Sequence, residues 1–144
     1  MHRKFGIVRL AALVPELTVG DVAYNVEQMS AQLRNIEQEK CDIVIFPELA
    51  ITGYTCADLF HQGLLLAVAE KGLSALRGCT AETSAVVVVG IPVAIGAHIY
   101  NCAAVMQGGS LLGLVPKTVI PVYGEFYERR WFASAAALTE YETV

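Results

Sequence analysis

Short apolar runs alternate with helical stretches along this chain, and this alternation restricts the possible folds more than any other feature. The clearest run is AVVVVGI at 85–91, which predicts a strand that Pro92 stops. An apolar stripe repeats every three or four residues between Val22 and Ile36, as on one face of a helix. The expected elements are strands at 5–13 and 42–46, helices at 22–37 and 59–77, a strand at 85–91, and strands near 98–106 and 110–115.

Cap and turn residues separate these elements. Asp21 is placed to cap the first helix and Asp58 to cap the second, which we expect to end near Gly78. Gly108 and Gly109 predict a hairpin between the last two strands. Alternating strands and helices followed by a hairpin predict an α/β fold, with a mixed sheet and flanking helices.

Composition excludes several classes of function. Hydrophobic residues make up 55% of the 144 residues and charged residues only 17%. We therefore expect part of the apolar surface to be covered by further polypeptide or by a second copy of the chain. The net charge of −4 gives no electrostatic basis for binding nucleic acid or an anionic membrane. No GxGxxG or Walker pattern occurs, so we expect no cofactor in this chain.

The cysteines show neither a metal-binding nor a disulfide pattern. Cys41, Cys56, Cys79 and Cys102 form no CxxC pair, and no histidine lies at metal-ligand spacing. Each lies in or beside an apolar segment, so we expect four reduced, structural thiols and no metal site. The sequence also contains no signal peptide and no apolar run of the ~18 residues that span a bilayer. These features predict a cytoplasmic protein.

Glu48 is the first candidate for chemistry. It lies two residues beyond Phe46, at the end of an expected strand, and ligands of open α/β sheets gather at the carboxyl ends of strands. The apolar residues around it would disfavour its charged form, which suits a general base near neutral pH. The alternative is an ordinary solvated glutamate in a loop.

Lys117 is the second candidate, and it lies in an apolar frame after the last expected strand. An ammonium group there can hold a developing negative charge such as an oxyanion. The alternative is a lysine whose stem covers apolar surface while its head stays in water. Because a carboxylate and an amine in a dry site can move protons for a nucleophile, we predict that Glu48 and Lys117 converge on one pocket.

Tyrosines and charged residues follow the lysine closely. Tyr123, Glu125 and Glu128 precede a pair of arginines, Trp131 and Phe132. One interpretation is a substrate-binding wall, in which carboxylates hold an ammonium group and tyrosines provide shape and hydrogen bonds. The other is the start of an amphipathic helix with exposed charges.

Taken together, these segments resemble the nitrilase, or carbon–nitrogen hydrolase, superfamily. FPE at 46–48 and PKTVIP at 116–121 resemble the motifs that carry the family's glutamate and lysine. The longer strings at 46–60 and 114–132 resemble the amidase domains of glutamine-dependent NAD synthetases, and the likeness runs over most of 5–132. The implied fold is the four-layer α-β-β-α nitrilase sandwich, of which this chain would hold about half.

The resemblance also implies roles for individual residues. Glu48 is the general base, and Lys117 supports the tetrahedral intermediate. Tyr123 corresponds to a glutamine-binding tyrosine, and Tyr54 lines the pocket. Glu125 is the preferred counterpart of the family's second, supporting glutamate, and Glu128 is the other candidate. The implied reaction hydrolyses glutamine to glutamate and ammonia through a cysteine thiolate and a glutamyl thioester.

Other parts implied by the resemblance lie outside this sequence. The family's cysteine follows its lysine motif by some tens of residues, which is beyond residue 144, and Cys56 belongs instead to the FPE loop. A synthetase domain that uses ATP and Mg to make NAD from nicotinic acid adenine dinucleotide is also implied.

We therefore expect residues 1–144 to be the N-terminal portion of a glutamine amidase domain. Alone it should be inactive, and because half a sandwich leaves sheet edges exposed, it should form a homo-oligomer. Two alternatives stay open: a fragment of a free-standing amidase of the superfamily, and a non-catalytic nitrilase-like module that binds a partner or small ligand.

Overall fold

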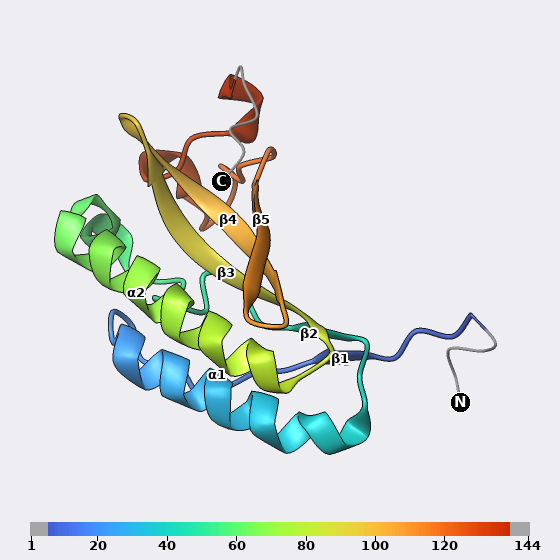
Figure 1. Cartoon of the computed structure of the whole chain (residues 1–144). Helices are drawn as coiled ribbons and strands as arrows, with labels where there is room; N and C mark the ends of the chain where they lie inside the picture. The colour runs from blue at the N-terminus through green and yellow to red at the C-terminus, as the bar shows by residue number, and fades with distance from the viewer. Residues whose placement is uncertain (1–5, 139–144) are drawn as a thin grey trace.

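The computed structural model describes residues 6–138 (Figure 1). One five-stranded sheet has the strand order β1-β2-β3-β4-β5. The first two pairings are parallel and the last two antiparallel, so the predicted α/β class with a mixed sheet is confirmed. The main elements are β1 (Leu10–Ala12), α1 (Val22–Ile36), β2 (Ile43–Ile45), α2 (Gly63–Cys79), β3 (Val86–Ile95), β4 (His98–Gln107) and β5 (Ser110–Pro116).

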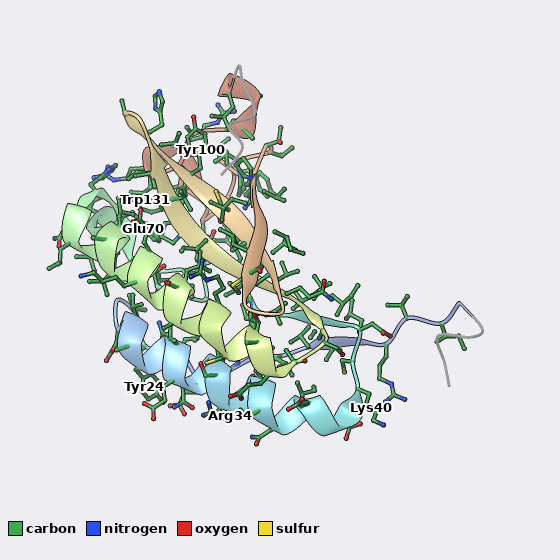
Figure 2. The ribbon with its side chains drawn as sticks, in the orientation of Figure 1. Tyr24, Arg34, Lys40, Glu70, Tyr100 and Trp131 are labelled. Carbon is green, nitrogen blue, oxygen red and sulfur yellow. The ribbon has the colours of Figure 1, made fainter. Side chains whose placement is uncertain are left out.

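The two helices lie side by side along one face of the sheet (Figure 1). Asp21 caps α1 as predicted, because its side chain accepts a hydrogen bond from the Tyr24 N–H at 3.0 Å. The predicted apolar stripe of α1 is buried, whereas Arg34 of α1 and Glu70 of α2 are exposed (Figure 2). Burial of one stripe on each helix therefore sets how both helices pack on the sheet.

The start of the second helix differs from the prediction. Residues Ala57–His61 form a 3-10 helix, and α2 begins only at Gly63. Asp58 does not cap α2, because its carboxylate accepts hydrogen bonds from Arg130 and Trp131 instead. Two hydrogen-bond donors that are distant in the sequence therefore bind the carboxylate that the local sequence pattern assigns to a helix N-terminus.

Pro92 does not stop the third strand, which runs on to Ile95. The carbonyl of Val88 accepts a hydrogen bond from Phe46, so the backbone groups of Val88 point away from β4. The backbone groups of Gly90 also form their hydrogen bonds on the side away from β4. Pro92 is two residues further along β3, so its nitrogen points to that same side, beyond the end of β2. Its missing N–H therefore removes no bond from the β3–β4 ladder.

The other strands differ from the predictions mainly in length. The expected strand at 5–13 is observed only as β1, and residue 5 lies outside the described residues. The strand expected at 42–46 is likewise shortened to β2. The hairpin is confirmed, since Gly108 and Gly109 join β4 to β5 with positive φ angles of 55° and 79°.

The sheet has one covered face and one open face. Val44, Val87 and Met106 are among the buried side chains under the helices. The strand registers place Leu10 and Val115 on the opposite face, where they are 55% and 60% exposed. This open face carries the predicted functional residues. Across residues 6–138, no helix has the length and apolar character to span a membrane.

Candidate active site

Glu48 lies on a loop, here called the Glu48 loop (residues 46–53), that is attached to β3 at Gly90. The Gly90 N–H donates to the Pro47 carbonyl at 3.3 Å, and the Gly90 carbonyl accepts from the Ile51 N–H at 3.2 Å. A Cβ at Gly90 would lie only 2.0 Å from the Leu49 nitrogen, so the loop crosses the strand where only glycine leaves room. Leu49 itself has a left-handed φ of 52°, which marks a locally strained turn beside the carboxylate.

Glu48 and Lys117, 69 residues apart in the sequence, are in direct contact. The Lys117 Nζ donates to Glu48 Oε1 at 2.7 Å. Lys117 follows β5, and its backbone N–H donates to the carbonyl of Asn101 on β4 at 2.8 Å. The open face of the sheet therefore brings the two predicted residues together, as the convergence prediction requires.

Glu128 completes the arrangement from the other side of the lysine. Its side chain is only 3% exposed and accepts from Lys117 Nζ at 2.9 and 3.1 Å. The Tyr54 hydroxyl donates to Glu128 Oε1 at 2.7 Å, and the Asn101 side chain donates to Glu48 Oε1 at 2.6 Å. We refer to Glu48, Tyr54, Asn101, Lys117 and Glu128 as the lysine cluster. Its central feature is one ammonium group between two carboxylates.

Two predicted residues lie outside these contacts. Tyr123 is 73% exposed, and its ring packs edge-to-face on Phe126. Glu125 is exposed, whereas Glu128 is the glutamate that contacts Lys117. Of the two glutamates, the structure therefore brings Glu128 and not Glu125 to the lysine. The alternative of an amphipathic helix finds no support, because residues 121–138 contain only 3-10 turns as regular structure.

Sequence reasoning missed Asn101. It lies within β4 and is only 4% exposed, among mostly apolar neighbours. A buried amide needs a hydrogen-bond partner, so an asparagine inside an apolar strand was a signal that something polar lies opposite. Nothing in the sequence alone identified that partner as Glu48.

Charge pairing sets the electrostatics of the cluster. Burial lowers the pKa of Lys117, but its hydrogen bonds and attraction to Glu48 and Glu128 raise that pKa by more, so the amine stays protonated. Burial, and then the hydrogen bond to Glu128, raise the pKa of the Tyr54 hydroxyl. The apolar shielding expected around Glu48 is not found, since its side chain is 44% exposed and paired with the lysine.

Two of the cysteines, Cys56 and Cys102, have environments that disfavour a thiolate. All four are free, as predicted. Burial raises the pKa of Cys102 to about 11, and burial also raises the pKa of Cys56, whose thiol donates to the Thr52 carbonyl. No group of three or more His, Cys, Asp or Glu side chains within residues 6–138 is arranged to hold a metal ion.

A second set of contacts holds the segment that carries Glu128, here called the Lys117 segment (residues 117–132). Asp58 accepts from Arg130 at 2.7 and 2.9 Å and from the Trp131 indole at 3.0 Å. The Phe60 ring packs against Phe132 with 4.8 Å between centroids. These contacts, the Asp58 clamp, fasten the segment to the 3-10 helix before α2.

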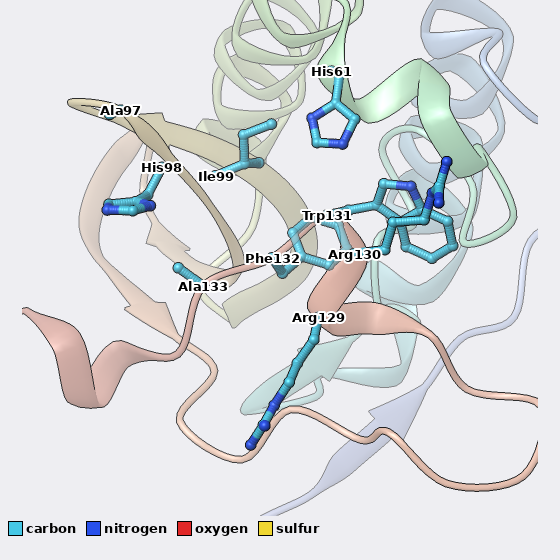
Figure 3. Close-up of a pocket in the computed structure, with 9 residues that line it drawn as sticks. All are labelled: His61, Ala97, His98, Ile99, Arg129, Arg130, Trp131, Phe132 and Ala133. Carbon is cyan, nitrogen blue, oxygen red and sulfur yellow. The ribbon is translucent and has the colours of Figure 1, made fainter.

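Beside the clamp lies an open pocket of about 270 Å³ (Figure 3). Its walls include His61, His98, Arg129 and Trp131, with His98 on one side and Trp131 on the other. None of the lysine-cluster residues lines it. The pocket is therefore separate from the carboxylates and lysine described above.

The sequence is similar to that of a family of known proteins. The sequence profile of the Carbon-nitrogen hydrolase family matches residues 8–143. A glutamine-dependent NAD(+) synthetase of Mycobacterium tuberculosis is 39% identical over 128 residues, which are 89% of this chain and 19% of that protein. The chain thus spans about a fifth of the length of the curated relatives that it matches.

Solved structures give the same result for the fold. A glutamine-dependent NAD(+) synthetase from Cytophaga hutchinsonii has a TM-score of 0.82 and 28% identity, over 88% of this chain and 22% of that one. An amidase of Nesterenkonia from the nitrilase superfamily has a TM-score of 0.72 at 20% identity, over 89% and 48% of the two chains. These neighbours confirm the predicted nitrilase-type fold.

Proposed function

The chain belongs to the carbon–nitrogen hydrolase family, and on that premise we propose that it supplies the base and the lysine of a glutamine-hydrolysing active site. Its relatives include proteins named glutamine-dependent NAD(+) synthetase. The observation that carries the proposal is the ammonium group of Lys117, held 2.7 Å from Glu48 and 2.9 Å from Glu128. A simple surface ion pair would not place a second, buried carboxylate on the same lysine.

The proposed steps follow from this arrangement. Glu48 takes the proton of a cysteine thiol, and the thiolate attacks the amide carbon of glutamine. Lys117 stabilises the oxyanion of the tetrahedral intermediate, which collapses to a glutamyl thioester as ammonia leaves with the proton held by Glu48. Water, deprotonated by Glu48, then hydrolyses the thioester to glutamate. Tyr54 and Tyr123 contribute to the glutamine-binding wall.

The nucleophile comes from polypeptide outside these 144 residues in this proposal. The raised pKa values of Cys56 and Cys102 argue against a nucleophilic role for either thiol. The apolar open face of the sheet is where the rest of the amidase domain would pack. That packing would provide the covering polypeptide that the apolar composition of the chain predicts.

The proposal extends to the whole protein. Ammonia would pass to a synthetase domain that binds ATP and Mg and makes NAD from nicotinic acid adenine dinucleotide, in a cytoplasmic homo-oligomer. ATP and Mg would be held by that other domain.

A glutaminase assay tests the proposal. Ammonia release is measured for the chain alone and for the chain joined to the remaining amidase segment of the Mycobacterium tuberculosis relative, which is 39% identical over the shared part. We expect release only from the joined protein, and a fall of roughly 10²–10⁴-fold in Glu48→Gln, the loss typical of a missing general base. Glu70→Gln, at an exposed position on α2, is the matched control.

The outcomes separate the alternatives. Hydrolysis of another amide but not of glutamine would favour a free-standing amidase. A folded joined protein that hydrolyses no amide would favour a non-catalytic binding module and overturn the proposal.

A further inference from the structure

We propose that Asn101 is the positioning residue that holds Glu48 and Lys117 in register, a role that rests on the proposed glutamine hydrolysis. Its side chain is buried in β4, where an amide without partners would be costly. The amide is turned toward a carboxylate oxygen that can only accept while ionised, so its nitrogen must be the donor.

Asn101 reaches both residues from a single point on the sheet. Its Nδ2 donates to Glu48 Oε1 at 2.6 Å, and its backbone carbonyl accepts from the Lys117 N–H at 2.8 Å. Strand β4 is paired on both sides, with Asn101 opposite Pro92 of β3. A residue in a doubly paired strand moves little, so it provides a fixed reference for two groups that come from loops.

The hydrogen bonds also select which oxygen of Glu48 does the chemistry. Asn101 and Lys117 both donate to Oε1. Within residues 6–138 no further donor is found on Glu48, so Oε2 is the oxygen available to take and return a proton. Two charge-assisted bonds to one oxygen fix the carboxylate plane, which pre-organises proton transfer to the other oxygen.

An uncharged donor of this length is needed at position 101. Aspartate has the same shape, but its carboxylate would meet Glu48 at hydrogen-bonding distance and repel it. Alanine leaves a gap without repulsion. The two substitutions therefore separate positioning by donation from a mere packing role.

The first test compares Asn101→Ala with Asn101→Asp in the joined, active protein. Loss of positioning should lower kcat by roughly 10²-fold in Asn101→Ala while KM changes little, and Asn101→Asp should lose more. If Asn101 only fills space, the isosteric aspartate should instead retain more activity than alanine. That order would overturn the inference. Thr80→Val removes another buried polar group, remote from the cluster, and should leave kcat unchanged.

The second test needs no activity and uses the 144-residue chain. In NMR spectra, Glu48→Gln should shift the Asn101 side-chain amide resonances more than those of any other asparagine or glutamine and should quicken their exchange with water. Glu125→Gln, which changes an exposed residue close to Glu128 in the sequence, should leave the Asn101 resonances unchanged. Asn101 side-chain resonances that do not shift in Glu48→Gln would overturn the inference.

The two tests distinguish the two ideas. The joined protein could lack glutaminase activity while the Asn101 amide resonances of the 144-residue chain shift in Glu48→Gln. That result would overturn the proposed function and support the positioning contact. Glutaminase activity with an unresponsive Asn101 would leave the function standing and remove Asn101 from it.

Discussion

The two parts of the lysine cluster are held in place by different forces. The Glu48 loop is built into the core, since Leu49, Ala50 and Ile51 are fully buried and its turn is bonded to the backbone of β3. The Lys117 segment runs over the surface, with Val119 80% and Tyr123 73% exposed. Beyond the packing of Ile120 and Phe132 in a small apolar cluster with Leu49 and Phe60, it is attached by charged side chains. Steric changes should therefore disrupt the loop, and changes of charge should disrupt the segment.

The largest effect should come from Gly90→Ala. The new Cβ would lie 2.0 Å from the Leu49 nitrogen and 2.8 Å from the Glu48 Cα, and both are backbone atoms that cannot rotate away. We expect the free energy of unfolding to fall by about 3 kcal/mol or more, at the upper end of overpacking costs. Urea denaturation followed by circular dichroism measures the loss.

Gly113→Ala is the matched control, because a Cβ at this position of β5 meets nothing within 4 Å. It should change the stability by less than about 1 kcal/mol. Equal losses in the two variants would mean that the Glu48 loop is not wedged against Gly90.

The second effect should come from removing the charge of Lys117. Lys117→Met leaves the buried Glu128 carboxylate without its cation, and we expect a loss of about 2 kcal/mol, below the 3–5 kcal/mol of fully buried pairs because the lysine is 29% exposed. Lys71→Met, an exposed lysine on α2, should cost less than about 0.5 kcal/mol.

A double-mutant cycle isolates the pair. Adding Glu128→Gln to Lys117→Met should recover part of the lost stability, because no unpaired carboxylate then remains. Strictly additive losses would show that the lysine and Glu128 do not interact in solution.

A smaller effect should appear at high pH. The pKa values of Lys117 and Tyr54 are raised in the folded chain above their ordinary 10.5 and 10.0, so their protonated forms contribute stability that is complete below about pH 10. That contribution is lost as the pH rises through the raised values. The urea midpoint should therefore fall between pH 10 and pH 11.5, and fall less in Tyr54→Phe. Tyr24→Phe, on α1, should follow the parent chain.

Sequence reasoning predicted the parts of the candidate site that follow from local sequence patterns. The motifs around Glu48 and Lys117 identified two residues that the fold brings into contact. The choice between Glu125 and Glu128 was not predictable, because they lie three residues apart in an irregular segment with no period to say which one points inward. Asp58 was assigned to a helix cap for the opposite reason: a local rule was available, and a partner 72 residues away overrode it.

The smallest effect should come from the ion pair of the Asp58 clamp, because the Asp58 and Arg130 side chains are exposed and act on position more than on stability. The hydrogen bonds from Arg130 and then Trp131 hold the pKa of Asp58 well below its ordinary 3.8. A group with a depressed pKa contributes above its unfolded value and loses that contribution only as the pH falls through the lower, folded value. Trp131 is the single tryptophan, so its fluorescence reports the clamp directly.

In the parent chain the emission should stay constant as the pH falls to about 3.8 and change only below it. Asp58→Asn should alter the emission at neutral pH and remove the acid transition, with little change in the urea midpoint, because exposed ion pairs contribute little. Asp21→Asn, at the cap of α1, should leave the emission unchanged. A large loss of stability in Asp58→Asn would mean that this exposed charged contact matters as much to the folded state as the packing of the Glu48 loop, and would remove the contrast between the two parts.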